Sequence, residues 1–66
     1  MVIKVIEVIG SSTTSWEDAA RDAAESAAKT VKGITGIDVV NFTASVKDGK
    51  ITKYKATCKL AFIVKD

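Results

Sequence analysis

The chain has 66 residues, of which 47% are hydrophobic and 27% are charged, with no proline and only four glycines. This length allows one domain, residues 1–66, without a two-domain catalytic cleft, and the composition excludes disordered and collagen-like proteins. Ten lysines and arginines against eight acids give a net charge of +2, which is too small a surplus to indicate a polyanionic partner by itself.

The first segment, Val2 to Ile9, is rich in β-branched residues and is followed by turn-forming residues at 10–14. This pattern predicts a strand and then a loop. Lys4 and Glu7 interrupt the apolar run, which is too short to span a bilayer and follows no basic leader. We therefore expect a cytoplasmic protein with no membrane partner.

A helix is predicted next, because either Thr14 with Glu17 or Ser15 with Asp18 fits a capping box. The two choices differ by one residue in where the helix begins. Apolar residues then recur at i, i+3, i+4 and i+7 for about four turns, and Gly33 supplies a left-handed stop. The opposite face carries charges of alternating sign at every fourth residue from Glu17. The apolar stripe consists of Trp16, Ala19, Ala20, Ala23, Ala24, Ala27, Ala28 and Val31.

Two further strands, Ile37 to Lys47 and Lys50 to Val64, flank Asp48-Gly49, which suits a tight hairpin turn with positive φ. Alternation places the even positions of the last strand on the helix, facing Val40, Phe42, Ala44 and Val46 of the preceding strand. The same alternation places Ile37, Val39 and Ile63 on the opposite face. The β-α-β-β order predicts an α+β fold, in which a three-stranded antiparallel sheet of order 1-3-2 packs on one helix.

This expected protomer covers its apolar surface poorly. Most helix residues that face the sheet are alanine, which buries little apolar area, and the first strand is apolar on both faces. A second covering surface is needed, and another copy of the chain is its simplest source.

The order of elements and the length resemble those of the dodecin family, and so do the segments VIEVIGSSTTSWEDA, AAKTVKGI and KITKYKATCKLAF. The most specific matches are V-x-E-x-x-G-(S/T)-S, which begins at Val5, and G-K-I-T-x-Y, which begins at Gly49. The resemblance covers nearly the whole chain. It implies a β-α-β-β subunit in a hollow homododecamer that binds a small ligand.

The resemblance implies a flavin site in which paired rings stack on a tryptophan just before the second strand and are hydrogen-bonded by a glutamine in the third. The resemblance places the tryptophan position on Gly36 and the glutamine position on Lys55. Loss of the aromatic plane removes stacking of about 1 kcal/mol beyond area burial, and a lysine donates hydrogen bonds but accepts none. Riboflavin or FMN is therefore expected to bind weakly or not at all. The ligand-binding positions that the resemblance implies are Gly36, Asp38, Lys55 and Thr57.

The stretch TSWED, residues 14–18, resembles a branch of the family described as binding calcium in place of flavin. Asp38 is the acid nearest the family's ligand position. In a symmetric assembly, copies of one carboxylate can converge around a hard cation such as calcium or magnesium. Asp38 is thus the candidate metal ligand, and the alternative is a solvated or ion-paired carboxylate.

The remaining candidate residues favour structural roles. Trp16 begins the alanine stripe, where packing in the core or an interface is favoured over flavin stacking. Cys58 lies among core positions as a small hydrophobic residue rather than a reactive thiol. The sequence contains no histidine and only this one cysteine, which excludes a disulfide within the chain, a zinc site and a Ser-His-Asp triad. Glu17 and Asp18 lie in the first helical turn, where negative charge favours the helix dipole.

A basic strand face at Lys53, Lys55 and Lys59 suggests a nucleic-acid surface, but the aromatic residues are expected on the other face, so no base-stacking platform accompanies it. The expected function is therefore binding or storage without catalysis, since no nucleophile–base pair is present. The alternative function is a structural shell without a tight ligand.

Overall fold

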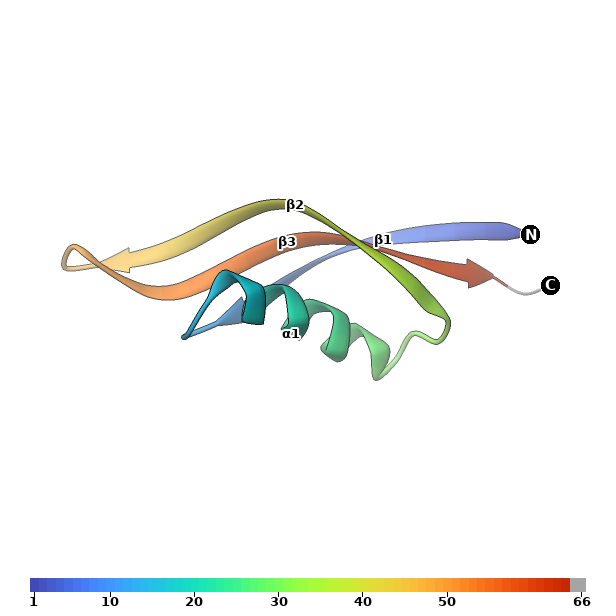
Figure 1. Cartoon of the computed structure of the whole chain (residues 1–66), viewed down its shortest axis with the longest axis horizontal. Coiled ribbons are helices and arrows are strands. Elements are labelled where there is room, and N and C mark those ends of the chain that lie inside the picture. Colours follow the sequence, from blue (N-terminus) through green and yellow to red (C-terminus); the bar gives the residue numbers. More distant parts are fainter. Residues whose placement is uncertain (65–66) are drawn as a thin grey trace.

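The computed structural model describes residues 1–64. Its elements are β1 (Val2–Ser12), α1 (Trp16–Ala28), β2 (Ile34–Lys47) and β3 (Lys50–Val64). The strands form one antiparallel sheet in the order β1-β3-β2, and α1 covers one face of it (Figure 1). The predicted α+β fold and strand order are confirmed.

β1 is three residues longer than predicted, because it continues through Gly10, Ser11 and Ser12. These residues pair with the first half of β3, which at 15 residues is long enough to supply partners for them. At Gly10 the strand approaches α1 so closely that an added Cβ would lie 2.1 Å from the carbonyl oxygen of Ala19. The glycine therefore permits the contact between strand and helix.

The helix begins at the second of the two predicted caps. Ser15 is the N-cap, and its Oγ accepts a hydrogen bond of 3.0 Å from the backbone N–H of Asp18. The regular helix ends at Ala28, although the N–H groups of Thr30 and Val31 still donate to the carbonyl of Ala27. The apolar stripe thus extends about one turn beyond the regular helix. The C-cap is Lys29 in a right-handed conformation, so the prediction that Gly33 ends the helix is wrong; Gly33, at φ +82°, instead turns the chain into β2.

The predicted hairpin turn is confirmed, since Asp48 and Gly49 both have positive φ, 53° and 74°. β2 begins at Ile34, three residues before the predicted start. Its register shifts between Val39 and Asn41, so Val40 occupies a bulge.

The bulge changes which face several residues occupy. Ile37 pairs with Leu60 and Val39 with Cys58, and directly paired residues share a face of the sheet. Because Leu60 and Cys58 face the helix, Ile37 and Val39 also lie on the helix side, so the prediction that they lie on the far face is wrong. Val40, predicted to face the helix, is 48% exposed.

The core is small. Its buried residues are Ala19, Ala23, Ala56, Cys58 and Leu60. Phe42, Val46, Ile3 and Val5 remain about half exposed or more, over an elongated chain of 51 × 19 × 13 Å. Because this protomer leaves large side chains in water on both ends of the sheet, it retains the uncovered surface that the alanine-rich stripe predicts.

Candidate functional site

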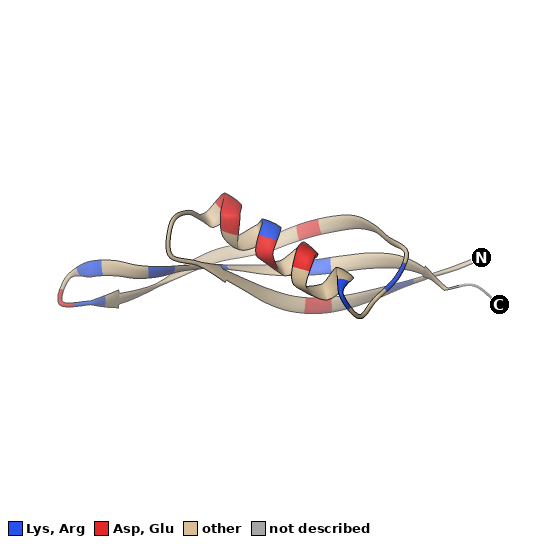
Figure 2. Cartoon of the chain, turned by 90° about the horizontal axis from the view of Figure 1, so that it is seen from below, with Lys and Arg blue, Asp and Glu red and all other residues tan. Residues whose placement is uncertain are grey.

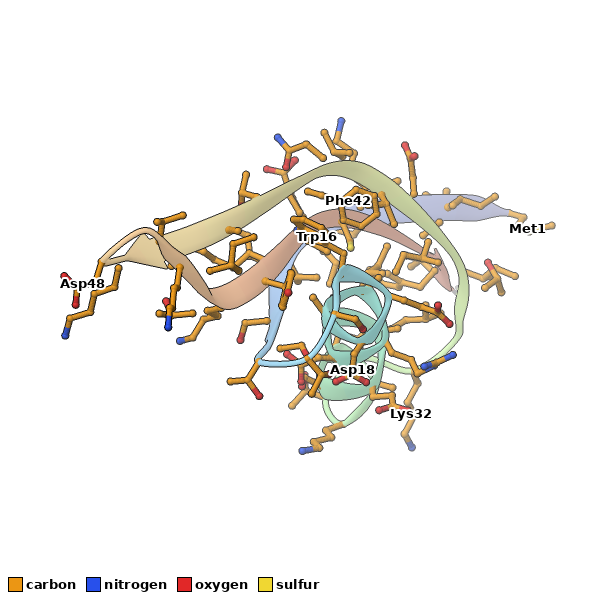
Figure 3. All side chains as sticks on the ribbon, turned by 60° about the vertical axis from the view of Figure 1, so that its left-hand side comes forward. Met1, Trp16, Asp18, Lys32, Phe42 and Asp48 are labelled. Carbon is orange, nitrogen blue, oxygen red and sulfur yellow. The ribbon has the colours of Figure 1, made fainter. Side chains whose placement is uncertain are left out.

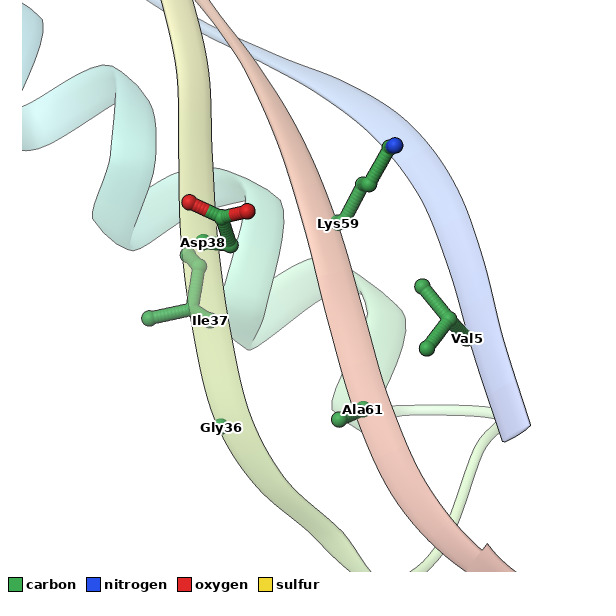
Figure 4. Close-up of a pocket in the computed structure, with 6 residues that line it drawn as sticks. All are labelled: Val5, Gly36, Ile37, Asp38, Lys59 and Ala61. Carbon is green, nitrogen blue, oxygen red and sulfur yellow. The ribbon is translucent and has the colours of Figure 1, made fainter. Parts of the chain in front are cut away.

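A shallow groove lies on the face of the sheet away from α1. Its volume is about 320 Å³, and residues from all three strands line it (Figure 4). Two of the predicted ligand positions, Gly36 and Asp38, lie in this groove. The lining residues are Val5, Gly36, Asp38, Lys59 and Ala61 on this face, with Ile37 at the β2 edge of the sheet.

The strand register explains how these residues come together. Gly36 and Val5 both pair with Ala61 of the central strand, which forms the apolar floor. One step along, Asp38 and Glu7 both pair with Lys59. The groove therefore ends at a row of charges that runs acid, base, acid across the sheet.

The Asp38 carboxylate is not closely ion-paired. Within residues 1–64, Arg21 and Glu17 form the only ion pair with an N–O distance of 4.0 Å or less. The Lys59 ammonium is thus farther than this from both Asp38 and Glu7. The Asp38 carboxylate can therefore attract a cation, but the positive charge of the nearby Lys59 weakens that attraction.

Gly36 leaves the groove open. A Cβ built on it would meet no atom within 4 Å, and no aromatic residue lines the groove. A planar ring bound here would thus find no aromatic face in this chain against which to stack.

Lys55 and Thr57 lie on the same face but outside the groove. Lys55 is six positions from Ala61 along β3, which corresponds to about 20 Å at the rise of an extended strand. Thr57 is two positions, or about 7 Å, from Lys59 at the charged end of the groove. One chain therefore places Thr57 near Asp38, the partner of Lys59, but holds Lys55 far from Gly36.

The sequence reasoning missed Lys59 as a member of the site. The sequence pattern indicates Lys59 only as part of a basic strand face, whereas the structure pairs it directly with Asp38. Strand order and alternation could have indicated this pair, but the register of β2 depends on a bulge that the sequence pattern does not reveal.

Trp16 lies on the helix side of the sheet, away from the groove. Its Nε1–H donates to the carbonyl of Thr43 at 2.8 Å, and its ring packs edge-on against Tyr54 and Phe42 at centroid distances of 4.8 and 6.3 Å. Figure 3 shows Trp16 and Phe42 side by side. Trp16 thus joins the start of α1 to the β2–β3 hairpin, which agrees with the structural role expected for it.

The carboxylates near the start of α1 are engaged in local hydrogen bonds. Asp18 Oδ2 accepts from the hydroxyls of Ser12 at 2.9 Å and Thr14 at 3.4 Å. Asp22 Oδ2 accepts from the N–H of Ser11 at 3.0 Å. These contacts fasten the end of β1 to the helix. Within residues 1–64, no three side chains of His, Cys, Asp or Glu gather as a metal site.

Cys58 is fully buried between the helix and the sheet, as predicted. Burial raises the pKa of its thiol above the ordinary value, and the negative charge of Asp38 raises it further. The group is therefore a neutral thiol at physiological pH and packs as a small hydrophobic residue.

The chain thus combines a three-stranded antiparallel sheet on one helix with a mixed apolar and charged groove on the open face of the sheet. The family model for dodecins matches residues 2–65. The chain belongs to the dodecin family.

Individual relatives agree with this assignment. A curated protein named calcium dodecin, from Mycobacterium tuberculosis, is 40% identical over 62 residues, which cover 92% of this chain and 86% of the relative. A structure of the calcium-chelating dodecin from that organism has a TM-score of 0.86 and 36% identity, with 98% of this chain and 93% of that one covered. A dodecin structure from Streptomyces coelicolor has a TM-score of 0.95 and 25% identity, with the same coverage.

The described part of the chain, residues 1–64, contains no helix that is long and apolar enough to cross a membrane.

Proposed function

We propose that this protein is a non-catalytic binding or storage protein of the cytoplasm, which assembles into a hollow homododecamer and holds a small ligand or metal ion inside. The observation that carries the proposal is the groove on the open sheet face, where Asp38 stands beside apolar residues. A face that one helix does not cover is available to line an internal cavity in an assembly.

A divalent cation, calcium or magnesium, suits the groove better than a flavin. Calcium prefers six to eight oxygen ligands, mostly carboxylates and carbonyls. Among residues 1–64, one chain offers Asp38 at the groove and Glu7 two strands away, with Lys59 between them. The fit within one chain is incomplete, so a cation site requires Asp38 from more than one copy. The 40% identity to a protein named calcium dodecin supports this choice.

The flavin alternative depends on groups that this chain lacks. Gly36 presents no aromatic face, and Lys55 lies about 20 Å along β3 from Ala61, the pairing partner of Gly36. If copies meet so that Lys55 of one approaches Gly36 of another, the double change Gly36→Trp with Lys55→Gln restores some flavin affinity. The open space at Gly36 accommodates the larger side chain. Stacking on the tryptophan and hydrogen bonds to the glutamine amide, which both donates and accepts, should together lower the flavin dissociation constant about a hundredfold.

Calcium binding is tested by equilibrium dialysis of the metal-stripped protein against calcium alone, with Asp38→Asn as the test variant. Asp48→Asn is a matched control, because it removes the same charge at the hairpin tip and asparagine tolerates the positive φ there. We expect saturable binding that Asp38→Asn weakens by about tenfold or more, while the control binds like the unmodified protein.

Two further measurements separate the alternatives. Absence of calcium binding, with an intact oligomer and no flavin quenching, favours a structural shell without a tight ligand. Strong quenching of riboflavin fluorescence by the unmodified protein contradicts the preference for a cation. A folded 7 kDa monomer in sedimentation at micromolar concentration contradicts the proposed assembly itself.

A further inference from the structure

The helix side of β2 is largely uncovered. α1 packs against β1 and β3 and barely touches β2. As a result, Ile37 and Phe42 face the helix side but remain 46% and 54% exposed. We call these two residues and the backbone between them the β2 strip. An apolar strip beside a packed helix is a surface that another element can cover.

A second uncovered element is the end of the β2–β3 hairpin, residues 44–53, which we call the arm. The arm projects past the start of α1 (Figure 1), beyond the point where Trp16 joins the helix to Thr43. Val46 and Ile51 pair across it and are 65% and 47% exposed. The arm therefore carries apolar side chains that residues 1–64 leave about half exposed or more.

The arm and the helix have opposite charges. The arm holds three lysines against Asp48, a net charge of +2, whereas α1 holds four acids against Arg21, a net charge of −3. Figure 2 shows the acids gathered on the helix and the lysines at the hairpin end. Within residues 1–64, the only close ion pair is Arg21 with Glu17, inside the helix itself. No lysine of the arm is thus neutralised by a close ion pair with the described residues.

We propose that the arm of one copy docks on a second copy, where Val46 and Ile51 cover the β2 strip and the arm lysines face the acidic side of α1. Each strand of the arm has four residues, about 13 Å in extended form. The thirteen-residue helix is about 20 Å long, so the arm fits along it. Apolar burial supplies the affinity, and the opposite charges set orientation and partner choice. This inference rests on the proposed self-assembly and specifies one of its interfaces.

The experiment reverses charges on each side of the interface. The arm variant carries Lys50→Glu and Lys53→Glu, the helix variant carries Glu17→Lys and Glu25→Lys, and the swapped variant carries all four changes. The control, Lys4→Glu with Lys32→Glu, makes the same change in net charge as the arm variant, at positions outside the arm and α1. Sedimentation velocity over a range of protomer concentrations reports assembly, and far-UV circular dichroism reports folding.

We expect the arm variant and the helix variant each to raise the protomer concentration at half assembly by about tenfold or more, because attraction becomes repulsion. The swapped variant should regain most of the lost affinity, since its arm and helix again have opposite charges. The control should assemble like the unmodified protein. If the single-side variants failed because they do not fold, combining all four substitutions would not restore assembly. Rescue by the swapped variant therefore indicates an interface between copies.

Other results overturn the inference. If the unmodified protein is a monomer, the proposed assembly fails and the arm contact fails with it. If the unmodified protein assembles and the arm variant assembles equally well, only the arm contact fails. Retention of assembly with loss of binding to a polyanion such as heparin would assign the arm lysines to that class of partner instead. Equal losses in the control would attribute the effect to net charge rather than to the interface.

Discussion

Replacement of Gly10 by alanine tests the closest approach between strand and helix in this fold. The added Cβ would lie 2.1 Å from the carbonyl oxygen of Ala19, 2.6 Å from the backbone nitrogen of Ala23 and 2.9 Å from the Cβ of Ala23. None of these atoms can move aside by a simple rotation, so α1 must shift away from β1 by about 1 Å to restore ordinary contact. Such overpacking costs about 1–3 kcal/mol.

That cost is large for this chain. A core in a domain of this size rarely supplies more than about 3–5 kcal/mol, and here two of the five buried core residues, Ala19 and Ala23, belong to the displaced helix. Gly10→Ala should therefore lower the midpoint of urea unfolding strongly and leave part of the protein unfolded in water. The measurement follows circular dichroism at 222 nm at one fixed protein concentration, since assembly also contributes to apparent stability.

Gly36→Ala provides the matched control, because its new Cβ meets nothing within 4 Å. It should leave the unfolding free energy unchanged or raise it by up to about 1 kcal/mol, because alanine lowers the entropy of the unfolded chain. The urea midpoint should therefore stay the same or rise slightly. Equal midpoints for Gly10→Ala and the unmodified protein would show that α1 does not pack on β1 at this distance.

Three other changes follow from the same packing. Ser15→Ala removes the hydrogen bond to the N–H of Asp18 and should cost about 1 kcal/mol of unfolding free energy; an unchanged urea midpoint would contradict the cap. Ala23→Leu, at a residue 3% exposed, should cost about 1–3 kcal/mol by overpacking, and more than Ala24→Leu at the half-buried next position; the reverse order of melting temperatures would refute this orientation of the helix. Cys58 should resist alkylation in the folded state, and rapid alkylation at pH 8 would contradict its burial. Its raised pKa should also make the unfolding free energy fall as the pH rises past the ordinary thiol pKa of 9.0, because the folded thiol keeps a proton that the unfolded thiol releases.

The sequence pattern was sufficient for the elements that depend on local chemistry. The spacing of the alanines predicts the helix, Asp48-Gly49 predicts the turn, and alternation along the last strand predicts burial of Cys58. Each of these signals lies within a few adjacent residues, where backbone preference and periodicity act directly.

Features that depend on contacts between distant segments were not predictable in this way. The bulge at Val40 leaves no compositional signal, yet it moves Ile37 and Val39 to the other face. The pair of Asp38 with Lys59 depends on that register. The distance between Gly36 and Lys55 likewise follows from strand length and pairing, so a family motif located both residues without indicating that one chain holds them apart.

Trp16 is the only tryptophan in the chain, and it lies where the helix meets the hairpin, with 37% of its surface exposed. An indole that is partly in water and hydrogen-bonded to a carbonyl changes its emission wavelength when either condition changes. The protein therefore contains an intrinsic optical reporter at the base of the arm. Its emission maximum should shift to shorter wavelength when a second copy covers this junction, so the assembly can be followed in real time without attaching a dye.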